Sequence, residues 1–137
     1  MIAGLLPHAG AMVLLDHIIA WDDTMLRAGS NTHLSPTNPL RRDGRLSAIC
    51  GVEFALQAAA LHGAMRAGGV AQRAGYVARL RDVALNIDRL DDPALGTLAI
   101  EARLEHAQPN GMLYALHIED KNGRILIEAR ASIALPT

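Results

Sequence analysis

The sequence has one cysteine, Cys50, among its 137 residues. A single thiol cannot form an intrachain disulfide, so the cysteine content gives no sign of an oxidising compartment, and we expect the protein in the cytoplasm. Aromatic residues are also scarce: they make up 3% of the chain, whereas hydrophobic residues make up 50%. The core must therefore be built from alanine, leucine, isoleucine and valine.

Neither sign of charge is in excess, because 13 lysine and arginine residues stand against 14 aspartate and glutamate residues, for a net charge of -1. This balance argues against nucleic acid as a partner, and the lack of a basic run argues against a membrane surface. The apolar start of the chain has no basic leader and is interrupted by Pro7, His8 and Asp16, so we interpret it as folded structure. The sequence shows no zinc-like pairing of histidines and no glycine-rich phosphate loop, so it predicts no metal and no other cofactor.

The hydrophobic patterns are typical of a single α+β domain over residues 1–137. Alternating apolar residues and turn dipeptides predict an antiparallel sheet that curls around one long helix. The predicted strands cover 11–23, 24–34, 75–87, 96–108, 111–120 and 124–135, with tight turns at Asn110-Gly111 and Asn122-Gly123.

The predicted helix follows a turn-rich loop at residues 35–46 and runs to about Met65. Ser47 is placed to cap its start, and Gly68 and Gly69 are placed to end it. The helix is apolar on nearly every side, which fits only if the sheet wraps around it.

One acid interrupts this apolar helix. In the stretch CGVEFALQAAALHG, Glu53 is followed by the amide Gln57, which lies about 40° away around the helix. His62 falls on the opposite side, so the polar residues do not form one solvated stripe. The other neighbours of Glu53 on its face are Ile49, Cys50, Ala60 and Ala64. This pattern predicts that Glu53 is buried.

Three segments in chain order resemble the hotdog-fold dehydratases that act on 3-hydroxyacyl groups carried on acyl carrier protein. LLPHAGAMVLLDHI is similar to the amino-terminal signature of that family, GVEFALQAAALHG to its central helix and GYVARLRDVALNI to the strand that follows. The loop and helix start, NPLRRDGRLSAICGVEFALQ, resemble the branch of the ApeP dehydratases of aryl polyene synthesis. The resemblance implies a hotdog fold, in which an antiparallel sheet wraps around one long central helix.

The resemblance also implies a reaction, the elimination of water from a 3-hydroxyacyl thioester to give a trans-2-enoyl thioester. Glu53 would protonate the departing hydroxyl group, a role that burial favours because desolvation disfavours the charged carboxylate. The family stabilises the thioester oxygen with a backbone amide of a Pro-Gly pair at the helix start. SAIC stands there in this chain, so the amide of Ala48 or Ile49 is the candidate donor.

The catalytic base is where this sequence departs from the family. The better-known enzymes place a histidine about fourteen residues ahead of the acid, and here that neighbourhood contains Asn38, whose amide cannot act as a base. His33 is the nearest imidazole and becomes the candidate base, while Asn38 is a candidate for orienting substrate. Gln57 is a candidate for substrate binding, with a structural hydrogen bond between helix and loop as the alternative.

Less specific interpretations of these residues stay open. Glu53 could be a structural acid that is satisfied by backbone or by an arginine such as Arg45. Three other histidines, His62, His106 and His117, are expected at the surface or rim of the fold.

Two further functional classes also stay open. Hotdog domains serve as acyl-thioesterases, for which Glu53 alone would suffice, and the chain could be a non-catalytic partner subunit of a related dehydratase. The expected partners are acyl carrier protein with its phosphopantetheine-linked substrate and another hotdog chain, in a homodimer, a dimer of dimers or a heteromer with another dehydratase.

Overall fold

In a computed structural model of the chain, the described residues are 2–6, 10–68 and 76–134. Residues 7–9 of the amino-terminal signature and Gly69 of the predicted helix end lie outside them. The strands are β1 (His17–Trp21), β2 (Met25–Ser30), β3 (Tyr76–Leu85), β4 (Leu98–Gln108), β5 (Gly111–Glu119) and β6 (Ile125–Ala134), and the α-helix is α1 (Gly51–Arg66). Short 3-10 helices are η1 (Ala3–Leu5), η2 (Gly10–Met12), η3 (Thr32–Leu34), η4 (Ala48–Cys50) and η5 (Pro93–Leu95).

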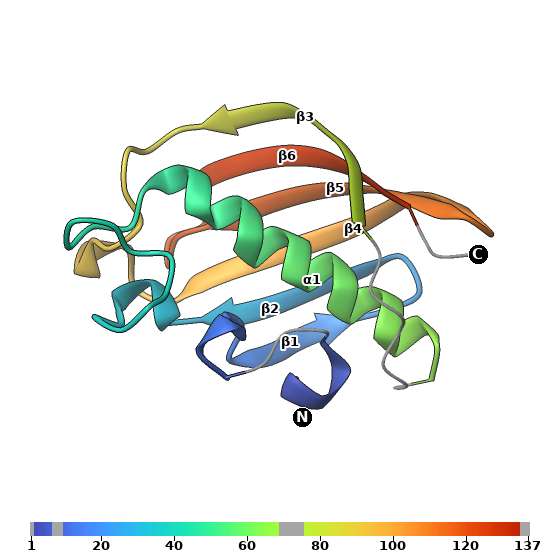
Figure 1. The fold of residues 1–137 in the computed structure, drawn as a ribbon, viewed down its shortest axis with the longest axis horizontal. Coiled ribbons are helices and arrows are strands. Elements are labelled where there is room, and N and C mark those ends of the chain that lie inside the picture. Colours follow the sequence, from blue (N-terminus) through green and yellow to red (C-terminus); the bar gives the residue numbers. More distant parts are fainter. Residues whose placement is uncertain (1, 7–9, 69–75, 135–137) are drawn as a thin grey trace.

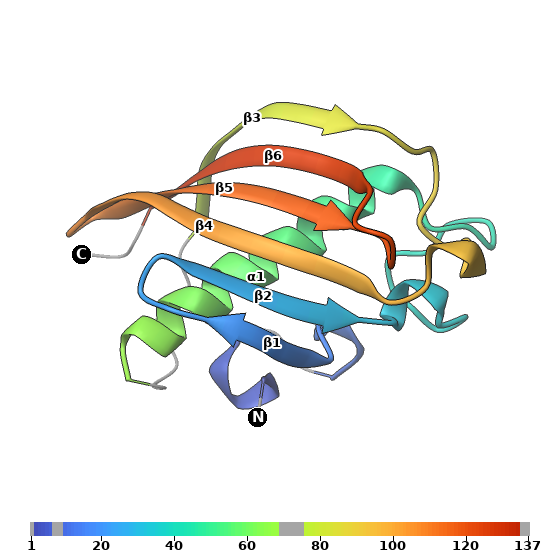
Figure 2. The same cartoon turned by 180° about the vertical axis from the view of Figure 1, so that it is seen from behind.

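The strands form an antiparallel sheet in the order β1-β2-β4-β5-β6-β3. The sheet curves around α1, which lies against its concave face (Figure 1). No helix of the described residues covers the opposite face of the sheet (Figure 2). The predicted architecture, an antiparallel sheet around one long helix, is therefore confirmed, and the sheet has two edge strands, β1 and β3.

α1 is apolar because the sheet and the amino-terminal segment cover most of its circumference. Its contacts with strands are mainly with β2, β4 and β5. A side chain at Gly51 would collide with the ends of Ile127, Ile118 and Leu90, so the absence of a Cβ lets the helix start approach the sheet. The stretch Ala48–Arg66 is long and apolar enough to cross a membrane, but 61% of its apolar window is buried inside the protein. The buried core helix of a folded domain can meet the same criteria of length and apolar composition.

The two ends of α1 differ in how well they were predicted. The side chain of Ser47 makes no capping hydrogen bond, so its predicted role as a cap is wrong, and η4 continues directly into α1 instead. At the other end the helix stops at Arg66, and Gly68 has a φ of 81°, a backbone conformation that favours glycine. The β4–β5 turn is at residues 109–110, one residue earlier than predicted, because Gln108 pairs with Gly111.

The loop that leads into α1 is held by Arg41. Its guanidinium donates hydrogen bonds to the carbonyls of His33, Ser35 and Gly44 and pairs with the Asp91 carboxylate at 3.4 Å. The end of the loop is fixed next to residues 88–90, because the Leu46 carbonyl accepts from Leu90 and a bridge joins Ser47 to Arg89. These contacts determine where η4 and the start of α1 lie.

Candidate active site

A narrow stripe of α1 is left uncovered. Its residues follow one another at intervals of three and four, so they lie on one face of the helix. They are Ile49 of η4 and Glu53, Leu56, Ala60 and Gly63 of α1, and each is partly or fully exposed in the single chain. Glu53 is the charged residue of this stripe, and the rest of it is apolar.

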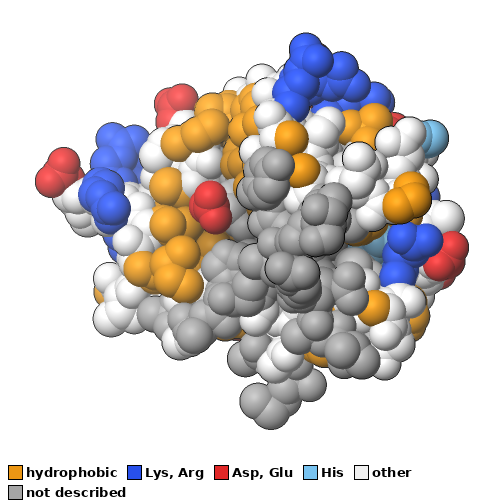
Figure 3. All heavy atoms as spheres, turned by 45° about the vertical axis from the view of Figure 1, so that its right-hand side comes forward, with side chains coloured by type: hydrophobic (Ala, Val, Ile, Leu, Met, Phe, Trp, Pro, Cys, Tyr) orange, Lys and Arg blue, Asp and Glu red, His pale blue; other side chains and the backbone are white. Residues whose placement is uncertain are grey.

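The inner surface of β3 stands across from this stripe. Val77, Leu80 and Leu85 pair with residues of β6 whose side chains point to the helix side, so they point there as well. They are nevertheless 41%, 39% and 44% exposed, because α1 packs on this face mainly against β2, β4 and β5 and leaves β3 uncovered. Figure 3 shows hydrophobic side chains gathered on the helix side of the molecule, with few charges among them. An apolar surface with one acid therefore lies between α1 and β3.

Glu53 is less buried than predicted. Its side chain is partly exposed in the single chain, because the stripe it belongs to faces away from the sheet centre. Within the described part of the chain its carboxylate makes no hydrogen bond and no ion pair, and the alternative pairing with Arg45 does not form. A partly exposed acid without a partner is open to a ligand, which a buried structural acid is not.

The two candidate backbone donors near Glu53 are not equivalent. The Ala48 amide already donates to the Asp88 carbonyl at 3.0 Å, so it cannot serve as a free donor. The Ile49 amide has no acceptor among the described residues, and it lies at the positive end of the helix dipole. Of the pair Ala48 and Ile49, the structure therefore leaves Ile49 available to bind an oxygen that carries negative charge.

Gln57 is fully buried one turn after Glu53, and both ends of its amide are used. The Oε1 atom accepts from the Leu14 amide at 2.8 Å, and the Nε2 atom donates to the Met12 carbonyl. These hydrogen bonds hold the amino-terminal segment against α1. Gln57 therefore positions the amino-terminal segment, and because its amide is buried and engaged at both ends, it is not presented to a ligand in this conformation.

Asn38 is also engaged within the protein. Its Nδ2 group donates to the Thr32 carbonyl at 3.0 Å, and its Oδ1 atom accepts from the Leu40 amide at 2.9 Å. The side chain is 6% exposed. Asn38 therefore shapes the loop between η3 and η4, and its amide is not presented to a ligand in this conformation.

His33 lies in η3 and is completely buried, with no exposed ring atom. Neither ring nitrogen has a hydrogen-bond partner in the described structure. Burial lowers the pKa of His33, and the Gly96 carbonyl, which faces the ring without completing a hydrogen bond, opposes this only in part. A base must contact the proton that it removes. In this conformation His33 is a buried core residue that does not reach the surface beside Glu53, so the geometry does not favour it as the base.

His62 was expected at the surface, and this expectation is wrong. The ring is fully buried: its Nε2 atom donates to the Asp22 carbonyl at 3.0 Å, and its Nδ1 atom accepts from the Tyr114 hydroxyl at 2.8 Å. The carbonyl can only accept, which fixes this tautomer. Burial lowers the pKa of His62 and raises the pKa of Tyr114 to about 12.

The two buried histidines predict how stability depends on pH. Their pKa values are lowered in the folded state from the ordinary 6.5, so the unfolded chain binds more protons once the pH drops below about 6.5. The free energy of unfolding should therefore fall as the pH is lowered from 6.5 to 5. Urea denaturation at several pH values measures this, and His33→Leu should reduce the fall, whereas the exposed control His106→Gln should not. If the free energy of unfolding depended on pH equally in the unsubstituted protein and in His33→Leu, His33 would not be a source of this pH dependence.

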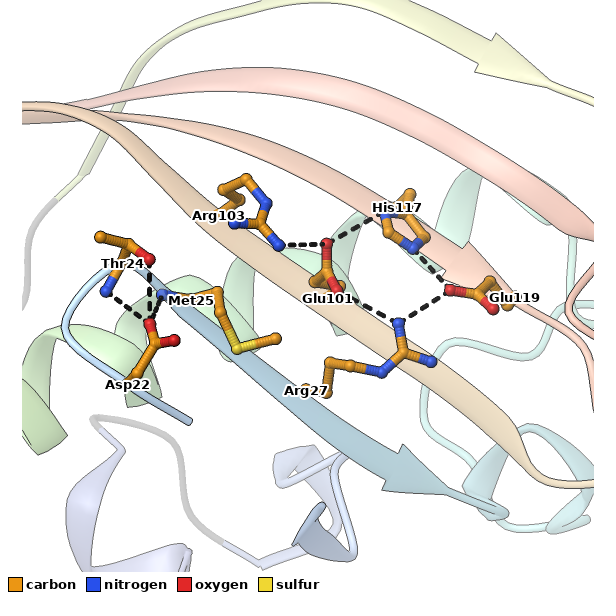
Figure 4. Close-up of polar contacts among 8 residues, drawn as sticks. All are labelled: Asp22, Thr24, Met25, Arg27, Glu101, Arg103, His117 and Glu119. Carbon is orange, nitrogen blue, oxygen red and sulfur yellow. Dashed lines mark hydrogen bonds and ion pairs between the residues drawn. The ribbon is translucent and has the colours of Figure 1, made fainter. Parts of the chain in front are cut away.

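A charged cluster occupies the outer face of the sheet, away from α1 (Figure 4). Arg27 bridges Glu101 at 3.1 Å and Glu119 at 2.8 Å, and the His117 Nε2 atom contacts Glu119 at 2.7 Å. The hydrogen bond from Arg27 is the main cause that lowers the pKa of Glu119. These groups satisfy one another, so the cluster does not compete with Glu53 as a candidate site. Within the described ranges, no three or more His, Cys, Asp or Glu side chains are arranged to hold a metal ion.

Comparisons with known proteins agree with this geometry. The sequence matches the ApeP-like family, described as ApeP dehydratase, over residues 1–137. The dehydratase heterocomplex ApeI:P from Xenorhabdus doucetiae has a similar structure, with a TM-score of 0.85 and 20% identity over 99% of this chain and 91% of that one. A comparison with curated proteins finds no match.

Other solved structures share the same fold at lower similarity. A hypothetical thioesterase protein from Streptococcus pneumoniae, solved with coenzyme A, has a TM-score of 0.63 and 15% identity over 88% of this chain and 84% of that one. The PaaI protein of the E. coli phenylacetic acid degradation operon has a TM-score of 0.60 and 14% identity over 86% and 81% of the two chains. At these identities the likeness shows the hotdog fold alone. Because the family match covers the whole chain, the protein belongs to the ApeP-like dehydratase family and has the hotdog fold.

Proposed function

We propose that the chain is a subunit of a dehydratase that removes water from 3-hydroxyacyl thioesters carried on acyl carrier protein. The observation that carries this proposal is the apolar stripe of α1 with one unpartnered acid, Glu53, one turn from the free Ile49 amide. An acyl chain fits the apolar surface between α1 and β3. The thioester and hydroxyl groups then lie at the polar end of this surface.

The chemistry requires a base and an acid. The base removes a proton from C2 of the acyl group, the electron pair forms the C2–C3 double bond, and the hydroxyl group leaves C3 with a proton from Glu53 as water. Negative charge develops on the thioester oxygen as the C2 proton leaves. The Ile49 amide would stabilise that charge without reorganisation, since it is fixed at a helix start and has no acceptor among the described residues.

The base is assigned to a second hotdog chain. Among the described histidines, His33 and His62 are buried, and His117 lies on the outer face of the sheet. His17 lies against Gly29 on that outer face too. No described histidine contacts Glu53, and His8 lies outside the described residues. The structure of a heterocomplex of two dehydratases from Xenorhabdus doucetiae supports a partner subunit as the source of the imidazole.

Thioester hydrolysis is the second candidate function. It is favoured by one observation, that among the described residues Glu53 has no partner and no histidine beside it, because a lone carboxylate can activate water against a thioester. Incubation with a 3-hydroxyacyl carrier protein separates the possibilities by mass spectrometry. Loss of water supports the dehydratase, release of free acid supports the thioesterase, and no change with or without a dehydratase partner contradicts both.

The chain should associate through the β3 edge in solution. β3 pairs only with β6 in the described sheet and exposes Val77, Leu80, Val83 and Leu85. An unpaired edge with apolar side chains favours pairing with another chain. We expect light scattering to show a dimer or a larger assembly at micromolar concentration, and a double variant, Leu80→Lys with Val83→Lys, to shift it toward the monomer. A stable monomer of the unsubstituted protein would contradict this expectation.

A further inference from the structure

Two arginines project from the loop beside the candidate site without carboxylate partners. Arg42 and Arg45 flank a two-residue hairpin turn, because each donates its amide to the carbonyl of the other at 2.9 and 3.0 Å. The central residues Asp43 and Gly44 have φ values of 52° and 74°, as the favoured Asp-Gly hairpin turn requires. Residues directly opposite each other in such a pair carry their side chains on the same face, about 5 Å apart at Cβ.

This arrangement brings two like charges together. Both arginines are exposed, and neither forms an ion pair in the described part of the chain, including with Asp43. One amino group of Arg42 is used on the carbonyls of Pro39 and Arg41, and the guanidinium of Arg45 has no polar contact among the described residues. Arg41, in contrast, points inward and clamps the loop. Arg41 thus holds the hairpin in place, whereas Arg42 and Arg45 expose their side chains to solvent.

The hairpin lies next to the candidate site. In the fold it projects beyond the amino-terminal end of α1 (Figure 1). The loop packs against the start of α1, because the Cys50 thiol lies 3.7 Å from the Leu40 carbonyl and the Arg42 guanidinium donates to the Pro39 carbonyl at 3.0 Å. The exposed Ile49 side chain and its free amide are beside Cys50. The hairpin with the two arginines is therefore adjacent to the start of α1, where Ile49 and Glu53 lie.

We propose that Arg42 and Arg45 bind the phosphate of the phosphopantetheine arm that presents the thioester to Glu53. The inference rests on the proposed function, because it takes the ligand to be a carrier-bound thioester. Arginine is suited to this role, since its planar fork of donors binds phosphate oxygens in pairs. Phosphate also relieves the repulsion between the two guanidinium groups. The arm occurs both on acyl carrier protein and in coenzyme A, and the phosphate is common to the two.

The test compares three thioesters of one acyl group, 3-hydroxyoctanoate: on carrier protein, on coenzyme A and on N-acetylcysteamine, which has no phosphate. Calorimetry gives the Kd of each thioester for the assembled protein. The same measurements are made on Arg42→Gln, Arg45→Gln, their double variant and the control Arg66→Gln, which lies at the far end of α1. We expect the double variant to bind both phosphate-bearing thioesters about a hundredfold more weakly. Binding of the N-acetylcysteamine thioester should be unchanged, and Arg45→Lys should restore part of the affinity.

Each other outcome overturns the inference. Weaker binding of the carrier-bound thioester alone would mean that the arginines recognise the carrier surface and not the phosphate. Equal losses for all three thioesters, or no loss, would mean that the arginines do not bind the arm. Far-ultraviolet circular dichroism checks that the variants are folded. The readout is binding, so arginine-dependent affinity without dehydration would leave the inference standing and contradict the proposed reaction instead.

Discussion

Replacing Glu53 by glutamine is expected to lower the rate of dehydration by about 10²-fold or more while leaving the fold intact. Glutamine has nearly the same shape as glutamate but cannot donate a carboxylic proton to the leaving hydroxyl group. The side chain is partly exposed and has no partner in the described structure, so its replacement breaks no contact. The free energy of unfolding should change by less than about 0.5 kcal/mol, as for other surface positions.

The measurement is kcat and kcat/KM for a 3-hydroxyacyl carrier protein, together with urea denaturation of the same preparations. Glu128→Gln is the matched control, because Glu128 is an exposed glutamate on a strand, β6, far from the candidate site. The control should keep full activity. Near-normal turnover of Glu53→Gln would remove Glu53 from the mechanism, and a rate loss that accompanies unfolding would return it to the structural alternative.

The sequence predicted the sheet and helix well because their signals are local. Alternation along residues 96–108 and 111–120 and the turn between them are properties of neighbouring residues, and they correspond to β4 and β5. The start of the helix was predicted less well. Ser47 has the residue type of a cap, but its backbone forms a bridge to Arg89, a residue more than forty positions away in the chain. Such a contact leaves no signal around Ser47 itself.

Burial of single polar residues was the part that sequence patterns predicted worst. Glu53 shares an apolar face, yet that face is the one the sheet leaves uncovered. His62 lies on the opposite side, where Tyr114 and the Asp22 carbonyl satisfy both ring nitrogens. Helical periodicity shows which residues share a face but not which face meets the sheet. The free amide of Ile49 was also beyond prediction, because Ala48 is excluded only by its hydrogen bond to Asp88.

The arginines of the loop before α1 likewise differ in ways that sequence patterns do not predict. Arg41, Arg42 and Arg45 stand within five residues of one another, and their shared residue type gives no reason to expect that one of them is held inside the loop. Arg41 is instead held by three carbonyls and by Asp91, whose carboxylate is 4% exposed and also pairs with Arg89. The hydrogen bond from Arg89 is the main cause that lowers the pKa of Asp91. Only the fold separates the arginine that builds the loop from the two that face solvent.

A pure homodimer of this chain is expected to have little dehydratase activity, and a histidine-bearing hotdog partner is expected to restore it. Loss of a positioned base costs about 10²–10⁴-fold in rate, so the difference should be large. The reason is structural: Asn38 stands near the position of the family histidine and uses its amide inside the loop, and His33 is buried without a route to substrate.

The decisive comparison is activity with and without a dehydratase encoded nearby, measured for the unsubstituted chain and for His33→Leu, which keeps an apolar side chain in the core. The complex should tolerate His33→Leu and should lose activity when the partner's catalytic histidine is replaced by alanine. Its rate should also fall at acid pH, because an imidazole base with an ordinary pKa of about 6.5 becomes protonated there. The assignment of the base to the partner would be overturned if the pure homodimer were fully active and if His33→Leu abolished that activity while the protein stayed folded. The loop after β2 would then have to open so that His33 reaches the substrate.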